Sequence, residues 1–334
     1  MDSLTQIVLG AATAELIVGK KIGNRALLYG GIIGTIPDLD VFVGMAYDIV
    51  TANEIHRGFS HSILFFLLAA PLLGLILQRL ERGSGVKLWT WIHVSFWCLL
   101  THALLDAFTN WGTQLLWPWD KKFAIQSIFV IDPLYTLPFI YCLIRVMRLK
   151  RQDIQRRKWN LYGILISSFY LILTVGLQAI AKDRFQDELS DSGIEYNKIS
   201  VRPAPLTAIL WNANISAKDG YYLGEYSFFD TKPIRFSYFK RNNALIEGYI
   251  DDPMIRRLTL LSEGWYALTE QDGEVYFNDL RFGLLNDDPQ KPEFVFRYLL
   301  KFQQGKIRAY EAKSPLRKEP KKLLIKLWYR IGGN

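Results

Sequence analysis

Histidine is scarce in this sequence of 334 residues, and none occurs after residue 102. There are only two cysteines, Cys98 and Cys142, and both fall within apolar runs. A structural disulfide is therefore not expected, and we interpret both as small core residues. Internal repeats, a P-loop and a dinucleotide-binding fingerprint are also missing from the sequence. These absences exclude the common nucleotide-binding classes and direct attention to the four histidines of the N-terminal part.

Long apolar runs are confined to the first 180 residues. Four of them approach the roughly 20 residues that cross a hydrocarbon core, and we interpret them as membrane helices. They are residues 63–80, 88–105, 128–147 and 161–180. Two shorter runs, 4–18 and 26–36, are rich in Gly and Ala and are expected to be tilted, half-inserted or packed inside. No basic residue precedes the first run, so a cleavable signal peptide is not expected. We predict an α-helical integral membrane bundle of about six helical segments over residues 1–182.

Basic residues at the ends of the apolar runs predict the orientation of this bundle. They cluster at 20–25, 79–87 and 148–158, and short basic loops stay in the cytoplasm. The intervening loops, 37–62 and 107–127, contain few basic residues. The expected topology therefore places these two loops, and the domain that follows residue 182, on the extracytoplasmic side.

Three motifs with metal-ligating side chains lie on the side that this topology predicts to be extracytoplasmic. They are Pro37-Asp38-Leu39-Asp40, His56-Arg57-Gly58-Phe59-Ser60-His61 and His102-Ala103-Leu104-Leu105-Asp106. Imidazole nitrogen and carboxylate oxygen together suit zinc or manganese. Ionisable residues at membrane depth are costly and usually functional, which favours a site where imidazoles and carboxylates of these motifs could converge on a divalent metal. Asp2 and Asp132 are expected at the same level.

Each motif also has a purely structural interpretation. His102 and Asp106 are four residues apart on a helix and could simply hydrogen-bond across a polar gap. In an extended turn Asp38 and Asp40 would point the same way, although either is also a common turn or cap residue. Ser60 is a possible cap for the helix that follows it.

Two further side chains also have competing interpretations. Arg57 is a candidate electrophile for an anionic substrate, or a partner for an aspartate. His93, among aromatic residues, is expected to be a packed core histidine.

Taken together, the motifs resemble the YdjM-like family of bacterial inner-membrane proteins, to which metal-dependent hydrolysis is attributed. The matching text includes Met1-Asp2-Ser3-Leu4-Thr5, the three motifs above and Ile131-Asp132-Pro133-Leu134-Tyr135. The pattern is distantly similar to the helical zinc-dependent phospholipase C and nuclease fold. That resemblance implies ligand roles for Asp38 or Asp40, His56, His61, His102 and Asp106. Many relatives have His at position 6, whereas this chain has Gln6, so one metal position is expected to be weakened.

The remaining sequence alternates aromatic and polar residues. Residues 183–312 are expected to form a β-rich soluble domain outside the membrane, with strands near 221–228, 234–239, 265–269, 274–278 and 294–300. Residues 313–334 form a basic tail that predicts an amphipathic helix suited to an anionic lipid surface. This tail and the cytoplasmic loops account for much of the net charge of +8, so no nucleic-acid partner is expected.

The leading functional hypothesis is a zinc-dependent hydrolase in the inner membrane. Its expected substrate is a phospholipid or lipid-linked phosphate, with Asp38 or Asp40 accepting a proton from water. Asp2, Gln6, Ser60 and Asp132 are expected to support the metal ligands from behind. Two alternatives come from other classes: a metal-ion transporter and a non-enzymatic envelope scaffold.

Overall fold

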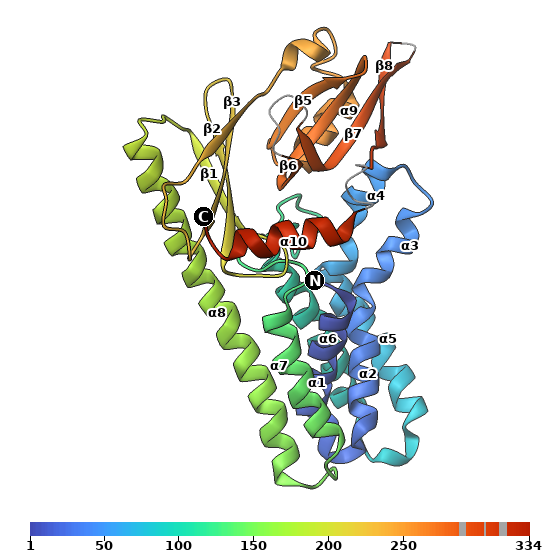
Figure 1. The fold of residues 1–334 in the computed structure, drawn as a ribbon. Helices are drawn as coiled ribbons and strands as arrows, with labels where there is room; N and C mark the ends of the chain where they lie inside the picture. Colours follow the sequence, from blue (N-terminus) through green and yellow to red (C-terminus); the bar gives the residue numbers. More distant parts are fainter. Residues whose placement is uncertain (287–291, 304, 314–318) are drawn as a thin grey trace. The chain divides into compact units, whose positions relative to one another are not determined.

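The computed structural model describes residues 1–286, 292–303, 305–313 and 319–334 (Figure 1). The chain divides into two compact units. The first contains residues 1–46, 55–176 and 205–207, and the second contains 47–54, 177–204 and 208–334. The expected order, a helical region followed by a β-rich region, is confirmed.

The first unit is built from long helices (Figure 1). They are α1 (Ser3–Ile22), α2 (Asn24–Thr35), α5 (Ile63–Leu80), α6 (Leu88–Ala107), α7 (Pro133–Met147) and α8 (Ile154–Asp191), whose last residues enter the second unit. Short helical turns connect them: η1 (Pro37–Leu39), α3 (Asp40–Gly44), η2 (Phe59–His61) and η3 (Arg82–Ser84).

Within the described part of the chain, three helices are long and apolar enough to cross a membrane: α5, α6 and α8. A fourth candidate is the pair Asn24–Thr35 and Pro37–Gly44, which is bent by 43° at its break. The membrane span expected over 128–147 is not among these candidates, because its helix begins only at Pro133 and has 15 residues. Proline is favoured at the first helical position, and the Asp132 side chain accepts from the backbone N–H groups of Leu134 and Tyr135 there.

Glycine allows α1 and α2 to pack closely. A Cβ atom added to Gly30 would lie 2.2 Å from the carbonyl oxygen of Gly10, and one added to Gly34 would lie 2.8 Å from that of Gln6. Such small residues let helix backbones approach within a membrane. This packing fixes Gln6 of α1 and Gly34 of α2 beside α6, where the histidine of the third motif lies.

A buried ion pair joins α1 to α8. The Arg156 guanidinium donates to both carboxylate oxygens of Glu15, at 2.7 and 2.6 Å, and also to the Asn24 side chain. Only 2% of the Arg156 side chain and 4% of the Glu15 side chain are exposed. Arg156 was expected in a basic loop, but α8 begins two residues before it and carries it into the helix packing.

The second unit contains two antiparallel sheets of four strands, each in sequential order. The first sheet is formed by β1 (Lys198–Pro203), β2 (Leu210–Ser216), β3 (Gly220–Ser227) and β4 (Phe236–Lys240). The second is formed by β5 (Tyr266–Gln271), β6 (Glu274–Asn286), β7 (Glu293–Gln303) and β8 (Lys306–Glu311). All five strand regions expected from the alternating pattern are strands here, whereas β1, β2 and β8 were not anticipated.

Besides the end of α8 and a helix in the basic tail, this unit contains η4 (Asn243–Ile246), α9 (Pro253–Leu261) and most of α4 (Ile49–Ile55). Most of α4 belongs to this unit although it lies in the sequence between Asp40 and His56. Val50 of α4 is fully buried in the same core as Leu258, and Asn53 donates to the Tyr298 hydroxyl at 3.1 Å. The β-rich unit therefore holds the segment that links the first two motifs.

The basic tail contains α10 (Pro320–Ile331), as its pattern predicts. Residues 314–318 of the tail lie outside the described residues.

Candidate metal centre

Four side chains from the three motifs meet inside the first unit. They are Asp38, His61, His102 and Asp106. One potential ligand atom from each residue lies within 4.8 Å of the others. The side chains of His61, His102 and Asp106 are completely buried, and 23% of the Asp38 side chain is exposed. This buried Asp/His group can hold a metal ion.

The distances between these atoms fit a tetrahedral ion. The two Nε2 atoms of His61 and His102 are 3.1 Å apart, and each lies 3.4 Å from Asp38 Oδ1. Asp106 Oδ2 lies 3.5 Å from Nε2 of His61 and 3.7 Å from that of His102. Tetrahedral zinc with ligands at about 2.0–2.2 Å has ligand atoms about 3.3–3.6 Å apart. The group therefore needs little rearrangement to enclose such an ion.

Hydrogen bonds behind the histidines orient both rings toward the centre. His102 Nδ1 lies 2.6 Å from the carbonyl oxygen of Gly34, which can only accept, so this nitrogen carries the proton. His61 Nδ1 lies 2.9 Å from Ser60 Oγ, whose hydroxyl donates to Asp40 at 2.7 Å. In this arrangement both Nε2 atoms face the centre. Metal-binding histidines are typically held in this way by a carbonyl or carboxylate.

The electrostatic surroundings of His61 also favour a cation at the centre. Burial lowers the pKa of His61, but Asp106, Asp38 and Asp40 together outweigh that effect and raise it to about 9. The same carboxylates that favour a proton on His61 would also attract a metal ion to the centre. A metal ion bound there would replace this proton.

Asp40 and His56 form a neighbouring pair outside the group of four. Asp40 Oδ1 accepts from His56 Nδ1 at 2.8 Å, and Asp40 Oδ2 accepts from the backbone N–H of Arg57 at 3.1 Å. The backbone that carries the two aspartates is not extended, and of the two interpretations the structure shows the ordinary turn. They lie around the 3₁₀ turn η1, so Asp38 reaches the histidine pair whereas Asp40 reaches Ser60 and His56.

Arg57 contacts the centre through Asp106. Its Nε lies 3.1 Å from Asp106 Oδ2, and its Nη1 donates to Thr109 Oγ1 at 2.6 Å. The residue is 3% exposed and has a φ of +65°, which is uncommon outside glycine and often found at functional sites. Of the two interpretations of Arg57, the structure shows the ion pair with an aspartate.

Gln6 lies at the same carboxylate. Its Nε2 donates to Asp106 Oδ1 at 2.9 Å, and its Oε1 is buried with no hydrogen-bond partner among the described residues. The α-amino group of Met1 also pairs with Asp106 Oδ1. The residue in which the sequence departs from the family pattern therefore faces the candidate metal ligands.

Three other residues have structural partners. Asp2 caps α1 by accepting from the backbone N–H of Thr5, and Asp132 caps α7 and accepts from the Tyr170 hydroxyl at 2.9 Å. The cap of α5 is Ser62, not Ser60, because Ser62 Oγ accepts from the backbone N–H of Phe65.

His93 was wrongly expected in the core. It lies on an exposed position of α6, with its ring centroid 4.8 Å from that of Trp89.

The sequence did not predict two hydrogen-bond partners of the site, the carbonyl of Gly34 and the hydroxyl of Thr109. A glycine carbonyl and an isolated threonine have no recognisable pattern in a sequence.

The loop after α6 packs against the second motif. The backbone N–H of Gln114 donates to the carbonyl of Arg57, and that of Ile63 donates to the carbonyl of Leu115. The rings of Phe59 and Trp117 meet with centroids 5.0 Å apart. This aromatic loop therefore supports the turn that positions His61.

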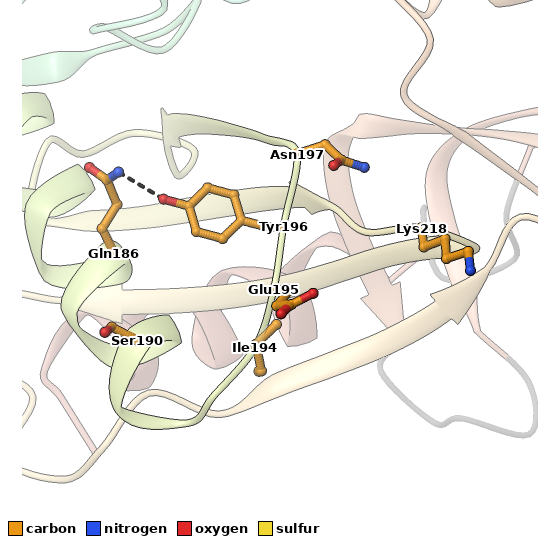
Figure 2. Close-up of a pocket in the computed structure, with 7 residues that line it drawn as sticks. All are labelled: Gln186, Ser190, Ile194, Glu195, Tyr196, Asn197 and Lys218. Carbon is orange, nitrogen blue, oxygen red and sulfur yellow. Dashed lines mark hydrogen bonds between the residues drawn. The ribbon is translucent and has the colours of Figure 1, made fainter.

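A separate recess of about 740 Å³ lies in the β-rich unit (Figure 2). Its lining residues are Gln186, Ser190, Ile194, Glu195, Tyr196, Asn197 and Lys218. Gln186 donates to the Tyr196 hydroxyl at 2.9 Å, and a single carboxylate, from Glu195, lines the recess. With no histidine or cysteine among these residues, the recess is not a second metal site of the same kind.

Comparison with known proteins identifies relatives of the helical unit. Residues 1–184 match the family described as YdjM inner membrane protein. The inner membrane protein YbcI of Escherichia coli (strain K12) is 34% identical over 148 residues, which are 40% of this chain and 82% of that protein. The uncharacterized protein YfhP of Bacillus subtilis (strain 168) is 29% identical over 145 residues, 40% of this chain and 42% of that protein. No solved structure matches the chain significantly.

The matched region contains the complete Asp/His group, the candidate spans α5 and α6, and most of α8. The sequence motifs, the apolar helices and the family match agree. The chain belongs to the YdjM inner membrane protein family.

Proposed function

We propose that this protein is a membrane-bound, metal-dependent hydrolase that acts on a lipid-linked phosphoester at the outer face of the inner membrane. One observation carries the proposal: ligand atoms of four side chains, three of them completely buried, lie close together, with both imidazoles oriented from behind. Structural ion pairs do not require two imidazole nitrogens to face each other at 3.1 Å among carboxylates.

Zinc is the metal that we propose for this centre. Two imidazole nitrogens and two carboxylate oxygens suit zinc, and manganese is the alternative. With three protein ligands and an open position, where the partly exposed Asp38 yields to water or substrate, such an ion would supply Lewis acidity toward a phosphoryl oxygen and lower the pKa of water. His61 and His102 hold it with their Nε2 atoms, and Arg57 keeps Asp106 in place through its own ion pair.

The surroundings of Asp38 support a lipid-linked substrate. Asp38 has the only partly exposed side chain of the group. It is followed by Leu39 and α3, where apolar side chains are exposed. They are Leu39, Val41, Phe42, Val43 and Met45. A substrate that reaches the centre past Asp38 meets an apolar surface, which suits acyl chains.

His56 is the proton acceptor that we propose in place of the aspartates. Asp40 already accepts hydrogen bonds from His56, Arg57 and Ser60, so its oxygens are occupied. Because Nδ1 of His56 is bound to Asp40, Nε2 is the nitrogen that can act as a base. The His56 side chain is 30% exposed. A carboxylate-oriented imidazole is a common general base.

His56→Gln is expected to lower turnover by about 10²–10⁴-fold, the usual contribution of a general base, while bound metal stays near the parental amount. Metal content and turnover measured on the same preparations test this. Ser60→Ala is the matched control, because it breaks the link between Asp40 and His61 instead, and it should weaken metal binding. Loss of metal in the His56 variant would instead make His56 a ligand.

Gln6→His is expected to raise zinc affinity by about tenfold, because a nitrogen ligand would replace an amide next to Asp106. Isothermal titration of zinc into both proteins measures the change. Gln6→Leu is the control for side-chain volume without a ligand atom. Identical affinities in all three proteins would remove position 6 from the metal site.

The activity itself is tested with purified, zinc-loaded protein in mixed micelles that contain a phospholipid. We expect release of the head group, with or without its phosphate. His102→Ala and a metal chelator should each abolish this release. A water-soluble phosphodiester with the same head group should react more slowly, since it lacks acyl chains. A zinc-loaded protein that hydrolyses neither compound would refute the proposed reaction and favour the scaffold or transporter.

A further inference from the structure

The last helix, α10, leaves an apolar face uncovered. Of its 12 residues none is buried. Four large side chains are more than half exposed, and they recur at positions one, three and four apart, so they share one side of the helix. They are Leu324, Ile325, Trp328 and Tyr329.

The opposite side of α10 is fixed to the first sheet. Arg330 forms an ion pair with Asp230 at 2.7 and 2.8 Å, and its guanidinium also donates to the carbonyl of Glu225. Ser227 Oγ donates to the carbonyl of Ile331 at 2.6 Å. These contacts involve the C-terminal turn of the helix and β3 with its following turn. They determine which face of α10 is held and which is presented outward.

Basic residues accompany the presented face. Lys321, Lys322 and Lys326 are exposed, and residues 320–331 contain no acidic residue. Lys322 pairs with Glu319, which immediately precedes the helix. Aliphatic and aromatic side chains combined with lysine are typical of helices that lie in the interface of an anionic bilayer. Trp and Tyr are enriched at that level because their rings are apolar and their polar atoms remain hydrated.

We propose that α10 binds the surface of an anionic lipid bilayer, with the side chains of Leu324, Ile325, Trp328 and Tyr329 inserted among the head groups and upper acyl chains. Helix α8 runs without interruption from a candidate membrane span into the unit that carries α10. The helix α10 is therefore covalently tethered to a bilayer. This covalent link gives the helix a high effective concentration at the membrane, so even modest affinity suffices. The proposal is independent of the hydrolase activity and adds an attachment point for the β-rich unit.

The test uses nitroxide labels on the full chain in nanodiscs that contain phosphatidylglycerol and phosphatidylcholine. Cys98 and Cys142 are buried, so a new surface cysteine can be labelled selectively, with the unlabelled parent as background. The labels are placed by Ile325→Cys on the presented face and by Leu260→Cys on α9, which is also an exposed apolar position in the same unit. Collisions with oxygen, which concentrates in lipid, are compared with collisions with an aqueous nickel chelate.

At position 325 we expect oxygen collisions to exceed those at position 260 several-fold, with nickel collisions reduced by a similar factor. The double substitution Lys321→Glu and Lys322→Glu, or nanodiscs of phosphatidylcholine alone, should move the label toward the aqueous pattern. A label at Trp328→Cys repeats the measurement if the first variant is poorly produced. Equal aqueous exposure at 325 and 260 would overturn the proposal, and so would protection from both reagents, which indicates cover by protein.

Discussion

His102→Ala is expected to lower the affinity for zinc by more than about 100-fold. Loss of a residue that only hydrogen-bonds to a ligand already lowers metal affinity about 10–100-fold. His102 supplies a potential ligand atom directly. Hydrolytic activity should be lost together with the metal. Zinc content after dialysis against a weak chelator, followed by titration, measures both the stoichiometry and the affinity.

His93→Ala is the matched control, because it removes an imidazole from the same helix at an exposed position next to Trp89. Its zinc affinity should equal that of the parent. If both variants lose metal to the same extent, the effect on α6 is general unfolding, and the ligand assignment is contradicted.

Arg156→Leu is expected to destabilise the helical unit by about 3–5 kcal/mol. Removing the guanidinium leaves the Glu15 carboxylate buried between α1 and α8 without its bidentate partner. The midpoint of denaturant unfolding in detergent, followed by helical circular dichroism, gives the change in the free energy of unfolding.

The double substitution Glu15→Leu and Arg156→Leu should recover most of this loss, since a buried ion pair and an apolar pair of similar volume are often nearly equal in stability. A double variant that is as unstable as Arg156→Leu would show that the loss came from the other Arg156 contacts, with Asn24 and the carbonyls of Val146 and Leu149.

The sequence predicts the third motif of the centre best. His102 and Asp106 are four residues apart within a long apolar run, so helical periodicity alone places both on one side. The apolar runs likewise identify α5, α6 and the middle of α8, because a span of that length and composition has few alternatives.

The sequence could not predict which of the two aspartates, Asp38 or Asp40, and which of the two histidines, His56 or His61, lies at the centre. For the aspartates, this depends on whether residues 37–39 are extended or turn as a 3₁₀ helix, and one change of backbone conformation redirects both carboxylates. For His56 and His61, the outcome depends on the turn through Arg57 at positive φ. Tertiary packing, here of the aromatic loop against that turn, selects such conformations.

The ion pair of Glu15 and Arg156 was missed for a related reason. Arg156 lies among several basic residues, and the sequence pattern assigns all of them to a loop. Only the start of α8 at Ile154 turns this one residue toward α1.

Helix α4 lies in the sequence between the first two motifs, and most of it belongs to the β-rich unit. Residues 47–54 connect Asp40 to His56, and they pack within the β-rich unit through Val50, Asn53 and the ion pair of Glu54 with Arg257. The motif that contains Asp38 and Asp40 and the motif that contains His56 and His61 are thus joined by a segment that packs within the β-rich unit.

X-ray absorption at the zinc edge, on protein purified after growth with zinc, tests the central claim most directly. The account predicts about one zinc per chain with four light ligands at about 2.0–2.1 Å, two of them imidazoles, and loss of this signal in His102→Ala. Protein that contains no stoichiometric metal under these conditions, or a spectrum without imidazole ligands, would contradict it.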